Sequence, residues 1–331
     1  MSSTPNIEFE SSNNRDKFEQ TLEYYNSGFK QELESIRTYR LMKKEAKDMK
    51  VDIETALNAT TEAVQRVKSF TQDHSYHMVG PSPWPLFNSL SLLSLTSSFA
   101  FLMHSYGNIK YIAALAAVSL ICSMSLWLKD IISEGTYTGN HTLAVQKGIS
   151  MAFTLFIISE IFFFLSIFWA YFHSALSPAV ELGVAWPPLG IKPINPFELP
   201  LLNTIILLSS AVSVTYAHHC LIKNEREGSL NGLVFTIILA VFFTYFQNLE
   251  YSVSGFTISD GVFGSCFFFG TGFHGLHVLI GTVFLFVGLG RVFAYHFSGN
   301  HHLGLESAIL YWHFVDIVWI FLYLAIYYWG S

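Results

Sequence analysis

Between residues 149 and 172 the chain reads ISMAFTLFIISEIFFFLSIFWAYF, an apolar stretch that contains a single charged side chain, Glu160. About 20 apolar residues are enough for a helix to cross the hydrocarbon core of a bilayer. Similar stretches recur along the chain, and they predict seven spans at about residues 86–104, 111–134, 143–174, 200–222, 230–253, 262–292 and 304–327. Strands of about ten residues with alternating polarity are not visible in the sequence, so helices are favoured over a barrel. We expect an all-α, polytopic membrane protein.

The charged residues are concentrated before the first span. Residues 1–80 hold 24 charged side chains, whereas the following 251 residues hold 18. Apolar residues at helical spacing between about residues 15 and 70 predict a soluble amphipathic helix or helix pair. The chain is therefore divided into a charged helical extension, residues 1–75, and a seven-helix membrane domain, residues 76–331. The sequence contains no basic patch that would indicate a nucleic-acid partner.

The lysines and arginines of the membrane domain predict its orientation. An odd number of spans places the two termini on opposite sides of the membrane. Lys110 and Lys192 then lie on the outer side, and the other five basic residues lie on the side of the Lys/Arg-rich N-terminus: Lys129, Lys147, Lys223, Arg226 and Arg291. The positive-inside rule therefore places the N-terminus in the cytoplasm or matrix.

Glu160 is the acid that the sequence places deepest in the membrane. It follows Lys147 by 13 residues and precedes His173 by 13 residues, which corresponds to about 20 Å of helix on either side. An ionised acid at that depth costs about 2.5 to 3.5 kcal/mol, and such residues often mark functional sites. Desolvation favours the neutral form, so we expect Glu160 to be largely protonated. The alternative is a structural role, in which the neutral acid donates one hydrogen bond to a neighbouring helix.

The histidines of the membrane domain raise the question of a metal or haem site. Candidates are the pairs His274 and His277, His313 and Asp316, and His218 and His219, together with the loop residues His301 and His302. Helical histidine pairs can bind metals, but a haem in a bundle needs ligands on two facing helices at matched depth. Hydrogen bonds between helices and contacts at the membrane surface are the simpler interpretation. We expect no metal-binding site, and the three single cysteines show no metal or disulfide spacing.

A second group of polar residues gathers at the inner ends of the spans. It comprises Trp127, Lys129, Glu134, His141, Lys147, Arg291 and His296. Cations at this level can bind lipid phosphates, and tryptophan is common at head-group depth. The alternative is ordinary snorkelling of long side chains to the membrane surface.

Many motifs between about His74 and Ser331 closely resemble those of the cytochrome c oxidase subunit III family, and they occur in consistent order. Among them are Pro81-Ser-Pro-Trp-Pro85, Ala144-Val-Gln-Lys-Gly148, Phe156-Ile-Ile-Ser-Glu160, Trp186-Pro-Pro188, Pro200-Leu-Leu-Asn-Thr204, Phe256-Thr-Ile-Ser-Asp-Gly261, Thr271-Gly-Phe-His-Gly-Leu-His277 and Tyr311-Trp-His-Phe-Val-Asp316. The resemblance covers about three quarters of the chain and looks most like the mitochondrial form. The extension that precedes His74 is longer than is usual in the family.

The resemblance implies a non-catalytic core subunit of respiratory complex IV, the haem–copper oxidase that reduces oxygen with electrons from cytochrome c and pumps protons. It implies a cleft between helices 1–2 and 3–7 that binds phospholipid, namely phosphatidylethanolamine, phosphatidylglycerol or cardiolipin. Partners would be subunits I and II, which hold haem a and copper, and accessory subunits. The chain itself would hold no cofactor, stabilise subunit I and support proton uptake. We expect it in the mitochondrial inner membrane, with its N-terminus in the matrix and its C-terminus in the intermembrane space.

The resemblance also assigns residues. Glu160 matches the buried, carbodiimide-sensitive carboxylate of the family, and no residue is catalytic. The set implied to lie near lipid head groups is Glu134, His141, Arg291 and His296, to which we add Trp127. Ser133 and Ala294 stand where the animal mitochondrial form carries basic residues, so one head group would be held less tightly.

Two other functions compete with this interpretation. A stand-alone proton channel or transporter would use Glu160 as its carrier, but transport paths usually need several intramembrane ionisable groups, and the sequence suggests only one at mid-membrane. A b-type cytochrome with two histidine ligands would show haem absorption in the isolated chain.

Overall fold

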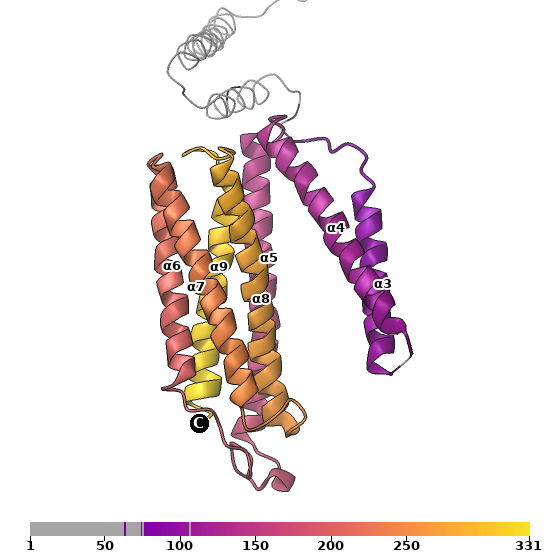
Figure 1. The fold of residues 1–331 in the computed structure, drawn as a ribbon, viewed down its shortest axis with the longest axis vertical. Coiled ribbons are helices and arrows are strands. Elements are labelled where there is room, and N and C mark those ends of the chain that lie inside the picture. Colours follow the sequence, from indigo (N-terminus) through magenta and orange to yellow (C-terminus); the bar gives the residue numbers. More distant parts are fainter. Residues whose placement is uncertain (1–62, 64–73, 75, 106) are drawn as a thin grey trace, which may run out of the picture. The chain divides into compact units, whose positions relative to one another are not determined.

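Seven long helices make up the membrane domain in the computed structural model, which describes residues 63, 74, 76–105 and 107–331 (Figure 1). They are α3 (Trp84–Met103), α4 (Ile109–Thr136), α5 (Leu143–Leu176), α6 (Leu199–Ile222), α7 (Arg226–Val253), α8 (Gly261–Phe293) and α9 (Leu303–Leu322). A short 3-10 helix, η1 (Val180–Leu182), lies between α5 and α6, and a π-helix, η2 (Tyr323–Tyr328), continues α9. All seven, with η2 counted as part of the last, are long and apolar enough to cross a membrane. The predicted all-α fold with seven spans is confirmed.

The observed helix ends lie close to the predicted ones, and the largest difference is at α7. This helix begins at Arg226, four residues before the predicted start. The first turn is polar, so the apolar pattern of the sequence does not include it. Its backbone is already helical, because the Ser229 N–H donates to the Glu225 carbonyl at 3.2 Å. The predicted helical extension between residues 15 and 70 lies outside the described residues, apart from residue 63.

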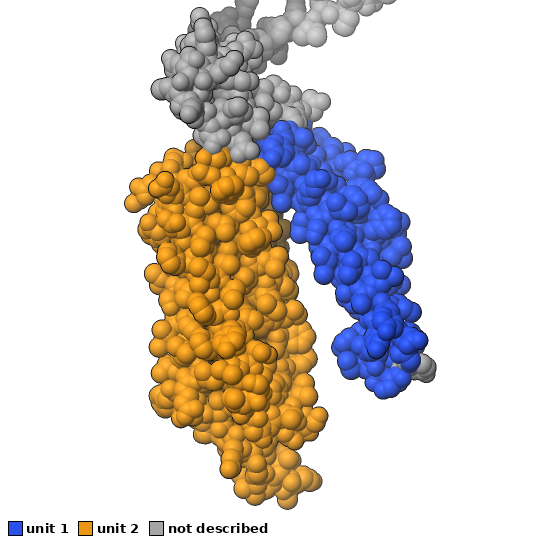
Figure 2. Space-filling view, in the orientation of Figure 1, with its two compact units in different colours: residues 1–145 blue, residues 146–331 orange. Residues whose placement is uncertain are grey.

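The chain divides into two compact units, residues 1–145 and residues 146–331, which Figure 2 colours separately. Unit 1 contains α3 and α4, which face each other through small polar side chains. The Ser119 hydroxyl donates to Ser91 at 3.1 Å, and the Ser123 hydroxyl donates to the Asn88 side-chain carbonyl. Interhelical hydrogen bonds between small residues are a common way for helices to associate in membranes. The expected grouping of the first two helices apart from the other five follows the same division.

Unit 2 is a five-helix bundle built around α9. In the apolar middle of the last span, 61% of the residues are buried inside the protein. The corresponding shares for α5 to α8 are 17% to 39%. Trp312 and Trp319 of α9 are fully buried, and their indole N–H groups donate to Ser210 and Thr204 of α6 at 2.9 and 3.0 Å. The central helix is therefore anchored to α6 by both packing and hydrogen bonds.

The segment between α5 and α6 packs onto one end of this bundle. The Trp186 indole N–H donates to the Tyr171 hydroxyl at 3.2 Å, and its ring lies 5.4 Å from that of Phe263 in α8. Figure 1 shows the C-terminus at the same end, whereas the α6–α7 and α8–α9 connections lie at the opposite end. The ends of α6 and α8 and the start of α9 therefore lie at the second end, which carries His218, Arg291 and His302.

Candidate functional site

Glu160 of α5 meets a partner that the sequence did not identify, His277 of α8. The Glu160 Oε2 atom lies 2.9 Å from the His277 Nε2 atom. The carboxyl side chain is 22% exposed and the imidazole 10%. Two residues that are 117 positions apart therefore form one polar site inside the bundle.

The hydrogen bonds of His277 determine where protons can be in this site. Its Nδ1 atom lies 2.7 Å from the Phe273 carbonyl, which can only accept, so Nδ1 carries a hydrogen. The contact between Nε2 and Oε2 then holds one further proton. If that proton lies on Glu160, both groups are neutral, and if it lies on His277, they form an ion pair. In both states the pair has no net charge, which is what a low-dielectric environment favours.

Aromatic rings surround the imidazole of His277. The ring of Phe164 lies 5.1 Å away in an edge-on arrangement, and those of Phe163 and Tyr311 lie 6.4 and 6.2 Å away in stacked arrangements. These contacts fix the orientation of the imidazole and exclude water from its faces. The site can hold a proton that two side chains share, away from bulk water.

The expectation that Glu160 is the only acid at mid-membrane is wrong, because Asp316 lies at a similar depth. It lies 13 residues after Leu303 and 12 before Tyr328, in the middle of the last span, and is 6% exposed. Its Oδ1 atom has no hydrogen-bond partner among the residues that the structure describes. The sequence argument treated Asp316 as a neighbour of His313 and did not consider its depth.

A further buried acid, Glu250 of α7, was missed by the sequence analysis. It is fully buried and accepts hydrogen bonds from the Tyr327 hydroxyl and from the Gln247 amide, the latter at 3.2 Å. The Asn203 amide in turn donates to Gln247 at 3.2 Å. This network joins α6, α7 and η2. The spacing of Gln247 and Glu250, three residues apart within one predicted span, was the available signal.

Three of the five predicted lipid-binding residues belong to unit 1, at the end of α4 that precedes α5. Trp127 and Glu134 are half-buried, and the Glu134 carboxylate lies 3.5 Å from the His77 Nε2 atom. His141 packs against Gly135, where a Cβ atom would lie 2.8 Å from the His141 Nδ1 atom. Glu134 and His141 thus lie at the same end of α4, and Trp127 lies about two helical turns before Glu134.

The other two, Arg291 and His296, belong to unit 2, at the end of α8. The Arg291 guanidinium lies over the Phe297 ring at 4.1 Å, and it passes so close to Gly304 that a Cβ there would lie 2.5 Å from Nη1. A cation stacked on an aromatic ring is held in place by its attraction to the ring. The Arg291 guanidinium is thus fixed against Phe297 and Gly304 at the end of α8.

The histidines of the bundle interior bond to neighbouring helices. The His274 imidazole is 1% exposed, and its Nε2 atom lies 3.1 Å from the Val315 carbonyl of α9. With the His277–Glu160 contact, this agrees with the interpretation of these two histidines as interhelical partners. His313 also bonds to a neighbouring helix, since its Nε2 atom lies 3.3 Å from the Thr215 hydroxyl of α6.

Comparisons with a family model and with individual proteins point to the same family. A family model described as cytochrome c oxidase subunit III matches residues 74–331. The cytochrome c oxidase subunit 3 of Neurospora crassa is 63% identical over 265 residues, which cover 80% of this chain and 98% of that protein. The proteins of the same name from Emericella nidulans and Rhizopus stolonifer are 64% and 56% identical, and they cover 78% and 83% of this chain and 96% of their own lengths.

Proposed function

Since this chain belongs to the cytochrome c oxidase subunit III family, and is thus a subunit of complex IV of the respiratory chain, we propose that it acts there as a non-catalytic core subunit. It is a multi-pass protein of the mitochondrial inner membrane. The observation that carries the proposal is that the family match begins at residue 74 and includes all seven spans. Haem a and copper belong to the partner subunits in this proposal, and this chain supports their reaction.

The partners of the proposed subunit are subunits I and II and the accessory subunits of the oxidase. Contact with subunit I would stabilise that subunit by burying apolar surface, and the bundle has many exposed apolar side chains for such a contact. The N-terminus would lie in the matrix and the C-terminus in the intermembrane space, which agrees with the distribution of lysine and arginine. The extension of residues 1–75 would be a helical arm on the matrix side that binds another subunit.

The Glu160–His277 pair supports a role in proton uptake. The Nε2 and Oε2 atoms of the pair are 2.9 Å apart, close enough to share one proton. Moving that proton from one side chain to the other changes no net charge, so it can shift within the pair at low electrostatic cost. We assign the pair a supporting role, because oxygen reduction itself takes place at the metals of the partner subunits.

Binding of phospholipid is the second supporting role that we propose. The head-group contacts would be Trp127, Glu134, His141, Arg291 and His296, with phosphatidylethanolamine, phosphatidylglycerol or cardiolipin as ligand. Arg291 places a positive charge at the end of α8, and charge-assisted hydrogen bonds to phosphate are stronger than neutral ones.

One experiment tests the core of this proposal. A tag placed after Ser331 should comigrate on native gels with haem a absorbance and with oxygen reduction, after solubilisation of the inner membrane in mild detergent. When the tagged chain is then separated from its partners, haem and copper should stay with the remaining subunits. Haem or copper that followed the separated chain would contradict the non-catalytic assignment.

A stand-alone proton transporter is the second candidate, and Asp316 is the observation that favours it. This residue supplies a second buried acid at mid-membrane. Against it, no hydrogen bond links Asp316 to Glu160 or Glu250 in the described part of the chain. The separated chain can be reconstituted into vesicles with an internal pH-sensitive dye. Proton flux that is lost in both Glu160→Gln and Asp316→Asn variants would support transport by this chain alone.

A further inference from the structure

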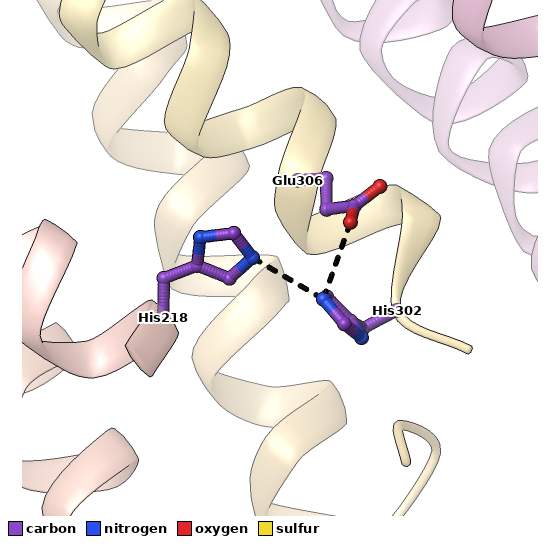
Figure 3. Close-up of side chains that lie close together, drawn as sticks. All are labelled: His218, His302 and Glu306. Carbon is purple, nitrogen blue, oxygen red and sulfur yellow. Dashed lines mark hydrogen bonds and ion pairs between the residues drawn. The ribbon is translucent and has the colours of Figure 1, made fainter. Parts of the chain in front are cut away.

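Three side chains with metal-binding atoms meet where α6 ends and α9 begins (Figure 3). His218 belongs to the last turns of α6, His302 directly precedes α9, and Glu306 lies in the first turn of α9. The Nε2 atoms of the two histidines are 3.2 Å apart, and His302 Nε2 lies 3.3 Å from Glu306 Oε1. The three ligand atoms all lie within 4.8 Å of one another.

These separations match those of a tetrahedral metal site. Zinc binds imidazole nitrogen and carboxylate oxygen at about 2.0 to 2.2 Å, so neighbouring ligand atoms of a tetrahedron lie about 3.3 to 3.5 Å apart. Two of the three edges already have this length, and only the third, between His218 and Glu306, needs to shorten. Two histidines and one glutamate with an open fourth position are also a ligand set that zinc uses in proteins.

The hydrogen bonds of His302 prepare it to be a ligand. Its Nδ1 atom lies 3.0 Å from the Ser298 carbonyl, so Nδ1 carries the hydrogen. In the neutral ring, Nε2 is then an acceptor, and it has the His218 Nε2 atom at 3.2 Å and Glu306 Oε1 at 3.3 Å. A cation that replaced the proton between the two imidazoles could bind all three atoms. A backbone carbonyl that orients the imidazole in this way is typical of metal-binding histidines.

The surroundings offer both rigidity and access. His302 is 6% exposed, whereas half of the Glu306 side chain is exposed. A cavity of about 350 Å³ adjoins the cluster and is lined by Thr215, His218 and Glu306, among others. The cavity is large enough for water molecules that would complete the coordination of an ion.

We propose that His218, His302 and Glu306 form a binding site for a divalent transition-metal cation, with Zn²⁺ as the ion that suits the donors best. The bound ion would tie the end of α6 to the start of α9. The site differs from the expectation of no metal in this chain, since His218 and His302 are 84 residues apart and their spacing gives no metal signal. It is independent of the redox metals that the proposed function assigns to partner subunits.

The test measures zinc uptake by the intact oxidase complex. Complexes purified with a chelator are dialysed against Zn²⁺, and the metal content is measured by elemental mass spectrometry. We expect the wild type to take up one more zinc per complex than the His218→Gln and Glu306→Gln variants. His219→Gln is the matched control, because His219 is exposed, lies next to His218 and is outside the cluster; it should behave as the wild type. Equal zinc uptake by all four complexes would overturn the proposal.

A measurement on the wild type keeps the test valid if a variant fails to assemble. Diethylpyrocarbonate modifies accessible imidazole nitrogen, and peptide mass spectrometry reports each histidine. Saturating Zn²⁺ should lower the modification of His218 at least tenfold and leave His219 unchanged. If the two histidines respond equally to Zn²⁺, the cluster is held by a shared proton and the metal site is refuted.

Discussion

Gly232 lies where α7 approaches α6 most closely, and replacing it with alanine tests how tightly the bundle is packed. A Cβ atom at this position would lie 2.8 Å from the Ala217 Cβ and 2.9 Å from the Ser213 carbonyl oxygen. Ordinary contact begins at 3.4 Å, so the two helices must separate locally by about 0.5 Å. Because one of the two atoms belongs to the backbone, the clash cannot be relieved by a side-chain rotation.

The expected size of the effect comes from comparison with Gly272→Ala in α8. Both substitutions gain about 0.8 to 1 kcal/mol of helix propensity. Only the one at Gly232 overpacks an interface, which costs about 1 to 3 kcal/mol. At Gly272, no heavy atom of the described residues outside its own stretch of helix lies within 4 Å of the added carbon. The difference between the two variants therefore isolates the packing cost. It corresponds to a change of about 5- to 150-fold in the equilibrium for local opening.

Cys220 of α6 reports this opening, because its side chain is 4% exposed. In the purified oxidase complex, alkylation by a membrane-permeable maleimide is followed by peptide mass spectrometry, with the exposed Cys122 as internal reference. When opening and closing of the α6–α7 contact are fast compared with alkylation, the alkylation rate of Cys220 is proportional to the equilibrium constant for opening. Cys220 should then react about 5- to 150-fold faster in Gly232→Ala than in Gly272→Ala. Equal Cys220 rates in the two variants would refute the close packing of α6 and α7.

Three further predictions concern the proposed functions. Glu160→Gln should assemble and reduce oxygen within about threefold of the wild-type rate, since the lost barrier stabilisation would be below about 0.7 kcal/mol; loss of oxygen reduction in an assembled, metal-replete complex would show that Glu160 is obligatory. Arg291→Gln should lower copurified phospholipid and shorten the lifetime of activity, because about 1.5 to 3 kcal/mol of charged hydrogen bonding is removed; lipid analysis checks this, with Lys223→Gln as the control for snorkelling. Deletion of residues 15–70 should reduce the amount of assembled oxidase on native gels more than the turnover of each assembled enzyme, and unchanged assembly would contradict a subunit-binding arm.

The spans could be predicted from the sequence because a membrane imposes length and composition on a helix. A segment of about 20 apolar residues satisfies that constraint without knowledge of its neighbours. The same argument fails at polar helix ends, where Arg226 and Glu227 continue α7 beyond the apolar segment. It also gives no sign of the π-helical turn that ends the last span, since its sequence, YLAIYY, is as apolar as the helix before it.

The partners of the polar residues could not be predicted, because they come from distant parts of the chain. Depth alone identified Glu160, but its contact with His277 depends on how α5 and α8 are rotated about their axes. Similarly, the sequence paired His218 with His219 and His302 with His301, and only the fold places His218 and His302 3.2 Å apart. Residue spacing can predict contacts within one helix, whereas these contacts join different helices.

The buried acids illustrate why amide substitutions are the informative ones in this bundle. Glu160 faces an imidazole nitrogen and Glu250 accepts from a tyrosine hydroxyl, so each carboxyl is one half of a hydrogen-bonded pair. Truncation to alanine would leave the other half buried without a partner, at a cost of about 1 to 3 kcal/mol, and would confuse folding with chemistry. Glutamine at position 160 can still donate to the His277 nitrogen, but it cannot exchange a proton with it. A change in proton uptake in that variant would therefore come from the lost carboxyl group, because the packing and the hydrogen bond are retained.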